Sequence, residues 1–151
     1  MRLTSGAFAD GKPIPEHHTC DGANLSPPLQ WDAVPAATRS LVLLCDDPDA
    51  PAGTWHHWAV YDIAADRRSL PEDAAGRDGG GLRQAVNDFR KPGYGGPCPP
   101  PGHGPHRYHF RLLALDVAAL GMRRGASCRE VEQAARQHLI AEATLIGVYQ
   151  R

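Results

Sequence analysis

The side chains with the clearest capacity for chemistry lie in three separated segments of the sequence. The first, Asp46 to Pro51 (DDPDAP), supplies carboxylates, and the second, Trp55 to Trp58 (WHHW), supplies imidazoles. The third, Tyr94 to Tyr108 (YGGPCPPPGHGPHRY), adds histidines and a phenol among prolines and glycines. Proline stiffens the backbone, so a small pocket can form before a ligand arrives. The three segments together predict one pocket lined by carboxylate, imidazole and phenol groups.

Each of these segments adjoins a predicted β-strand. Residues 40–45 form a continuous apolar run that ends at the acidic segment, and residues 57–63 supply a second strand. Residues 106–115 alternate, with Tyr108 and Phe110 on the apolar face and Arg107 on the other. His106 has the same parity as Tyr108, so both side chains should line one cavity.

Adjacent histidines on a strand behave differently, because successive side chains point to opposite faces. Only one of His56 and His57 can therefore share a pocket with a given residue, and we expect the other to be structural. Asp47 could likewise only cap a turn before Pro48. Its place at the end of a buried strand favours a role in the pocket.

A helix is well signalled only near the C-terminus, where Ser127 and Glu130 match the Ser-x-x-Glu capping box. Its predicted apolar face consists of Cys128, Val131, Ala135 and Leu139. Residues 145–149 predict the last strand. Residues 70–96 have the composition of a connection, with Gly79 to Gly81 as its most flexible point. The 151 residues are thus expected to form a single, mostly β domain over 1–151.

Composition excludes several classes of partner. The chain carries 16 basic and 17 acidic residues, so it has no electrostatic footprint for nucleic acid or an anionic membrane. No apolar run resembles a signal peptide or reaches membrane-spanning length. We therefore expect a cytoplasmic protein with no membrane span.

The four cysteines are Cys20, Cys45, Cys98 and Cys128. They lack the spacing of a metal-binding ribbon, and a cytoplasmic setting disfavours structural disulfides. We expect four free thiols.

The glycine- and proline-rich run from Gly95 to Pro105 could be only an irregular surface loop. Its many prolines argue against a mobile lid, and it leads directly into His106 and Tyr108. It also lacks the Gly-Lys-Ser/Thr ending of a phosphate-binding P-loop, which argues against nucleotide hydrolysis. A stiff pocket wall is the interpretation we favour.

The order of these motifs resembles the phosphatidylethanolamine-binding protein family, and more narrowly its bacterial, Raf kinase inhibitor-like branch. The segment from Cys20 to Trp31 (CDGANLSPPLQW) precedes them, so the similarity covers nearly the whole chain. The resemblance implies a Greek-key β-sandwich of antiparallel sheets with short flanking helices. It also implies an anion pocket formed by Asp47, His57, Pro100, His106 and Tyr108, with Gly96 beside them.

Members of this family take up phosphate, acetate, cacodylate or a phosphoethanolamine headgroup in that pocket, without a settled reaction. The resemblance therefore implies a binding protein that is no enzyme and has no cofactor or resident metal. It extends to a phosphorylated protein partner, to regulation of a kinase or hydrolase, and to a homodimer. Because the chain ends at Arg151, we expect it to lack the C-terminal segment that gates the pocket in animal relatives.

The residues also suggest how an anion would be held. Imidazole N–H groups of His57 and His106 and the hydroxyl of Tyr108 would donate to an oxyanion. Asp47 would hold one histidine in the required tautomer or bond a cationic headgroup. Affinity for free phosphate should be weak, around millimolar, and should fall as pH rises through about 6 to 7.5.

Two enzymatic alternatives remain open at this point. A metal-dependent enzyme could use His57, His106 and Asp47, although no i, i+4 ligand pair supports it. A cysteine hydrolase could pair Cys98 with His103 or His106, although Cys98 has no helix N-terminus to lower its pKa.

Overall fold

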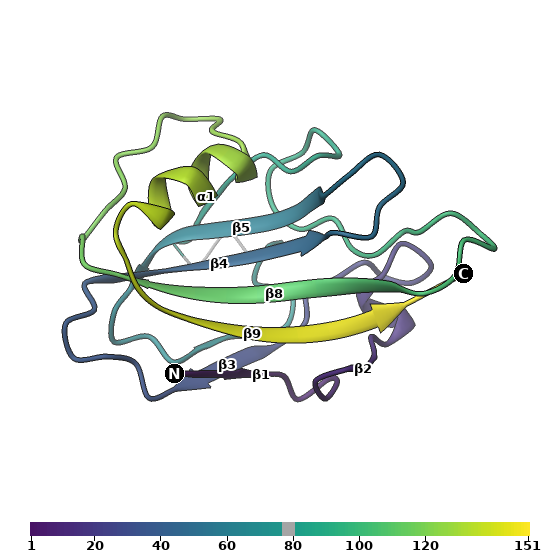
Figure 1. Ribbon diagram of the computed structural model, residues 1–151, viewed down its shortest axis with the longest axis horizontal. Coiled ribbons are helices and arrows are strands. Elements are labelled where there is room, and N and C mark those ends of the chain that lie inside the picture. Colours follow the sequence, from purple (N-terminus) through teal and green to yellow (C-terminus); the bar gives the residue numbers. More distant parts are fainter. Residues whose placement is uncertain (77–80) are drawn as a thin grey trace.

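Two β-sheets and one α-helix make up the described part of the chain, residues 1–76 and 81–151, in the computed structural model (Figure 1). The elements in chain order are β1 (Arg2–Thr4), β2 (Lys12–Pro13), the 3₁₀ helix η1 (Glu16–His18), β3 (Leu29–Asp32), β4 (Ser40–Asp47), β5 (Trp55–Ala64), β6 (Ser69–Leu70), β7 (Arg83–Gln84), β8 (His106–Leu115), α1 (Cys128–Arg136) and β9 (Leu139–Tyr149). Gly79 and Gly80, part of the predicted flexible point, lie outside the described residues. The prediction of a mostly β fold with a helix near the C-terminus is confirmed.

The larger sheet has six strands in the order β2-β9-β8-β4-β5-β7. All residues of β4 are buried, because the sheet is covered on both faces at this strand, which explains its uninterrupted apolar sequence. β8 coincides with the predicted strand, whereas β5 and β9 begin earlier than the sequence pattern indicated. The connection from β5 to β8 carries the chain across to the other side of β4.

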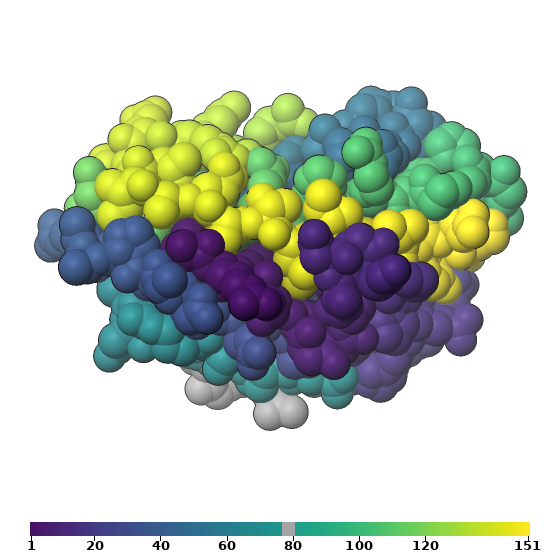
Figure 2. All heavy atoms as spheres, turned by 60° about the horizontal axis from the view of Figure 1, so that its bottom comes forward, coloured from purple at the N-terminus to yellow at the C-terminus, as the bar shows by residue number. Residues whose placement is uncertain are grey.

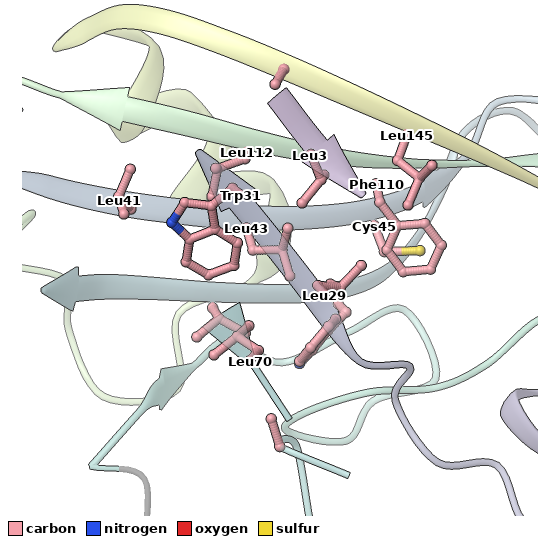
Figure 3. Close-up of a cluster of buried hydrophobic side chains, with 14 of the residues drawn as sticks. Leu3, Leu29, Trp31, Leu41, Leu43, Cys45, Leu70, Phe110, Leu112 and Leu145 are labelled. Carbon is pink, nitrogen blue, oxygen red and sulfur yellow. The ribbon is translucent and has the colours of Figure 1, made fainter. Parts of the chain in front are cut away.

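The smaller sheet, β1-β3-β6, packs against one face of the larger one and closes the main hydrophobic core. Figure 3 shows Leu3, Leu29 and Trp31 of the small sheet pointing toward Leu43 and Phe110 of the large sheet. Buried contacts of this kind are the main source of stability in a two-layer β-fold.

Helix α1 covers the opposite face of the large sheet, next to β4 and β5 (Figure 1). Its buried side chains Cys128, Val131 and Ala135 join a second apolar cluster with residues of β4, β5 and β8. The predicted N-terminal cap is confirmed, since the Glu130 N–H donates to Ser127 Oγ over 3.1 Å.

The helical assignment of Leu139 is wrong. The helix ends at Arg136, and the N–H of His138 donates to the carbonyl of Ala135. Leu139 instead begins β9, where it pairs with Leu115. Pairing with a neighbouring strand thus overrides the helical spacing of the apolar residues.

The N-terminal segment lies along β9 on the surface seen in Figure 2. β2 pairs in parallel with β9, with Lys12 opposite Gly147. This pairing protects part of the edge of β9 that β8 does not cover. Within the described residues, no helix combines the length and apolar character needed to cross a membrane.

Candidate functional site

The three chemically rich segments meet at a pocket of about 210 Å³. The residues that line it are Asp47, Ala50, Pro51, Trp55, His57, Phe89, Cys98, Pro99, Pro100, His106 and Tyr108. Five of the six residues that the sequence predicted as a site are therefore brought together. Their common location follows from strand pairing, because β4 lies between β5 and β8 and carries Asp47 at its end.

The parity argument for the histidines is confirmed. His57, His106 and Tyr108 line this pocket, whereas His56 lines a pocket formed with residues on the other side of the sheet. The doublet His56-His57 thus divides its two imidazoles between two faces. The doublet Asp46-Asp47 is divided in the same way.

A buried hydrogen bond joins the carboxylate of the pocket to one histidine. Asp47 Oδ2 lies 2.6 Å from His106 Nδ1, and the two residues are 3% and 1% exposed. The other oxygen, Oδ1, accepts the N–H of Asp49 over 2.8 Å. Since a carboxylate only accepts, His106 carries a proton on Nδ1 and presents Nε2 on its far side. Asp47 therefore orients the histidine and also caps the turn that follows β4.

The far side of His106 meets a third histidine. His103 Nδ1 lies 2.6 Å from His106 Nε2, so the two rings are hydrogen-bonded. His103 is exposed and stands between Gly102 and Gly104, both of which have positive φ angles, of 76° and 93°. A ligand that needs His106 Nε2 has to compete with His103 for it.

His57 is fixed by a backbone carbonyl. Its Nδ1 lies 2.5 Å from the oxygen of Gly95, so Nδ1 carries the proton and donates. Burial lowers the pKa of His57 below its ordinary value of 6.5, and the Gly95 carbonyl and the charge of Asp47 only partly offset this. His57 is therefore predominantly neutral, and its Nε2 makes no hydrogen bond with a described residue.

Tyr108 supplies a neutral donor. Burial, followed by the negative charge of Asp47, raises the pKa of its phenol above the usual range. The hydroxyl therefore stays protonated. The Tyr108 ring packs edge-on against His57, with ring centres 5.3 Å apart, which fixes the relative positions of the two groups.

Gly96, which was expected beside the pocket, is not among the residues that line it. Its N–H donates to Asn24 Oδ1 over 2.9 Å, so this amide is already engaged. A Cβ atom at this position would collide with Asn24 Oδ1 and with the carbonyl oxygen of His18. Gly96 is needed for the close approach of the proline-rich loop to the segment around η1.

The prediction of four free thiols is wrong for two of them. Cys20 and Cys98 form a disulfide with a Cα–Cα distance of 5.4 Å, whereas Cys45 and Cys128 are free and buried. The Cys20 N–H donates to the carbonyl of Pro97 over 3.1 Å, which holds the two chain segments side by side. The bonded sulfur of Cys98 cannot serve as a thiolate nucleophile, so the cysteine-hydrolase alternative fails in this state.

The sequence reasoning missed two aromatic residues at the rim. Trp55 and Phe89 are 36% and 37% exposed, and their rings lie edge to face with centres 5.4 Å apart. Trp55 could have been found, because it shares the parity of His57 on β5. Phe89 lies in an irregular connection, where no periodicity marks it.

A two-layer β-fold with a carboxylate, two histidines and a phenol in a proline-walled pocket defines a recognisable class of protein. The family model described as Phosphatidylethanolamine-binding protein matches residues 4–150. The chain belongs to the phosphatidylethanolamine-binding protein family, and the resemblance found in the motifs is confirmed.

Individual relatives are similar over the full length of the chain. The UPF0098 protein of Aquifex aeolicus (strain VF5) is 48% identical over 152 residues, which cover 100% of this chain and 89% of the relative. The UPF0098 protein YbhB of Escherichia coli (strain K12) is 40% identical over 160 residues, covering 99% of both chains.

Two crystal structures have the same fold. Escherichia coli YbcL, described as a new member of the mammalian PEBP family, superimposes with a TM-score of 0.94 at 36% identity, covering 99% of this chain and 98% of that one. The PEBP homologue CT736 of Chlamydia trachomatis D/UW-3/CX gives a TM-score of 0.89 at 38% identity, covering 99% and 97%.

Proposed function

We propose that this protein is a non-enzymatic binding protein for small oxyanions, such as phosphate, a phosphoethanolamine headgroup or a phosphorylated ligand. The observation that carries the proposal is the arrangement of the two histidines. Nδ1 of His106 is committed to Asp47 and Nδ1 of His57 to the carbonyl of Gly95. Each ring can therefore meet a ligand only through Nε2, and Nε2 of His106 first has to leave His103.

Protonation turns both Nε2 atoms into donors. An imidazolium formed at either ring keeps its Nδ1–H bonded to its present acceptor. The Tyr108 hydroxyl adds a third donor. Charge-assisted hydrogen bonds contribute roughly 1.5–3 kcal/mol each before the costs of association, so we expect free phosphate to bind around the millimolar range.

The rim of the pocket suits a ligand that carries an ammonium group as well as an anion. The exposed rings of Trp55 and Phe89 offer aromatic surface beside the pocket. Such surface attracts ammonium groups by cation–π interaction, worth about 0.5–1 kcal/mol at exposed sites. Phosphoethanolamine combines the two features and should bind more tightly than phosphate.

A phosphorylated side chain on a partner protein would bring further contacts. We infer regulation of a kinase or hydrolase as the corresponding role, with homodimerisation as a further expectation.

A cytoplasmic location also remains an expectation. The Cys20–Cys98 disulfide is a feature more typical of oxidising compartments, and it is therefore a reason to measure where the protein resides.

The metal-dependent alternative has less support at this pocket. Asp47 and His106 are bonded to each other, and His57 Nδ1 faces a carbonyl. Among the described residues, Asp47, His57 and His106 do not form a group of converging ligand atoms. The pocket is better equipped to hold an anion than a cation.

Calorimetric titration with phosphoethanolamine tests the proposal. The matched variants are His57→Gln and His56→Gln, which alter neighbouring residues on opposite faces of the sheet. We expect His57→Gln to abolish measurable binding and His56→Gln to retain it. Absence of binding in the unaltered, folded protein would overturn the proposal.

A further inference from the structure

The face of the large sheet that is turned away from the anion pocket carries a second polar cluster. Asp46 on β4 pairs with His56 on β5 and with His109 on β8, so the three residues lie side by side across the sheet. Glu132 comes from helix α1, which covers this face of the sheet. These residues line a pocket of about 410 Å³ that is separate from the anion pocket.

The ligand atoms in this cluster converge. One nitrogen of His56 and one carboxylate oxygen each of Asp46 and Glu132 all lie within 4.8 Å of one another. Asp46 and His56 are only 4% and 8% exposed. Asp46 and His56 are therefore held largely away from bulk water, whereas the Glu132 side chain is 21% exposed.

Two imidazoles in this cluster lack partners. Neither ring nitrogen of His56 hydrogen-bonds to a described residue, and His109 Nε2 is buried without a hydrogen-bond partner among the described residues. Buried polar atoms are nearly always paired. Unpaired imidazoles beside carboxylates are the donor set that binds divalent transition metals.

Arg111 already pairs with the carboxylates but leaves lone pairs available. Its guanidinium bonds to Asp46 Oδ2 and lies 3.3 Å from Glu132 Oε2. Asp46 Oδ1 accepts no hydrogen bond from a described residue. Carboxylates that bind metals are commonly held by such outer hydrogen bonds. Arg136 also donates to Glu132 Oε2 over 3.1 Å, and Arg129 lines the same pocket. The positive charges of the three arginines should weaken cation binding without blocking it.

We propose that Asp46, His56 and Glu132 form a binding site for a divalent transition metal such as Zn²⁺. Zinc bonds of about 2.0–2.2 Å require these atoms to draw closer to one another than they are here. The site uses Asp46 and His56, the first residues of the doublets Asp46-Asp47 and His56-His57. It is therefore independent of the proposed anion pocket, which uses Asp47 and His57.

Competition for Zn²⁺ against a chromophoric chelator, with protein free of affinity tags, tests the site. We expect one Zn²⁺ per chain and a loss of affinity of at least about 10-fold in His56→Gln and in Asp46→Asn. His57→Gln should bind Zn²⁺ like the unaltered protein. Phosphoethanolamine titrations of the same variants should show the reverse pattern, so failure of one site is distinguishable from failure of the other.

A second measurement covers the case in which Asp46→Asn disturbs folding through Arg111. In the unaltered protein, Co²⁺ should broaden the NMR signals of the His56 ring before those of the exposed His17 and His103 rings. No stoichiometric binding, binding that survives both substitutions, or binding that is lost only in His57→Gln would overturn the proposal.

Discussion

Asp47 Oδ2 and His106 Nδ1 lie 2.6 Å apart in a hydrogen bond that is buried in the sheet. This contact sets the tautomer of His106 and joins the end of β4 to the start of β8. It also leaves Nε2 as the remaining ring nitrogen of His106, and this atom is hydrogen-bonded to His103 Nδ1 over 2.6 Å. The proposed anion site depends on this contact more than on any other.

Replacing the carboxylate should cost stability as well as ligand affinity. In Asp47→Asn only one side-chain oxygen remains to accept from both the Asp49 N–H and the His106 Nδ1–H. Leaving one of these donors without an acceptor should lower the free energy of unfolding by roughly 1–3 kcal/mol. Urea denaturation measures the change.

The control for this substitution is Asp49→Asn. Asp49 pairs with Arg107 at the surface, where an ion pair contributes roughly 0.2–1 kcal/mol. If both variants lose the same free energy of unfolding, the buried Asp47–His106 bond contributes no more to stability than the surface ion pair.

The close approach at Gly96 should be sensitive to a single methyl group. A Cβ atom there meets the carbonyl oxygen of His18 and the Asn24 side chain, and the backbone atom cannot move aside cheaply. We expect Gly96→Ala to lower the free energy of unfolding by roughly 1–3 kcal/mol. Gly6→Ala meets no atom within 4 Å and should leave stability nearly unchanged. Thermal unfolding of the two variants makes the comparison.

Anion affinity should fall as pH rises. Burial lowers the pKa of His57, so the ring is neutral, whereas a bound anion favours the imidazolium. Binding therefore takes up a proton, so affinity should fall as pH rises from below 6.5 toward the pKa of the imidazolium in the complex. Sulfate is the suitable probe, because phosphate monoesters themselves titrate near pH 6. A flat affinity between about pH 5.5 and 8 would remove the histidines from the mechanism.

The disulfide should govern both thiol counts and stability. Native protein should react slowly with a thiol reagent, because Cys45 and Cys128 are buried and burial raises the pKa of Cys128 to about 12. Unfolding without reductant should release two thiols, and reduction should release four. Loss of the bond in Cys20→Ser should lower the free energy of unfolding by about 2–4 kcal/mol. Four thiols on unfolding without reductant would contradict the pairing.

Local patterns in the sequence were sufficient to predict four strands of the large sheet, β4, β5, β8 and β9, and the parity of the site residues. The alternation of residues 106–115 matches β8, and it correctly puts His106 and Tyr108 in one pocket. The side-by-side histidines at 56 and 57 were correctly divided between two faces.

Contacts between distant segments could not be predicted in this way. Cys20 and Cys98 are separated by 78 residues, and no spacing rule links them. The partner of the Gly96 amide, Asn24, lies 72 residues away. The helical spacing that pointed to Leu139 was overridden by pairing between β8 and β9, which depends on the whole sheet.

NMR titration of the histidine side chains with phosphate and with phosphoethanolamine tests the proposed anion pocket most directly. In the unaltered protein, the His57 and His106 signals should shift together and saturably, with His103 changing as it releases His106. The variant His106→Ala should lose the response at His57, while the His56 signal should stay constant in both proteins. If neither His57 nor His106 responds while the fold is intact, the pocket does not bind these anions and the proposed function is wrong.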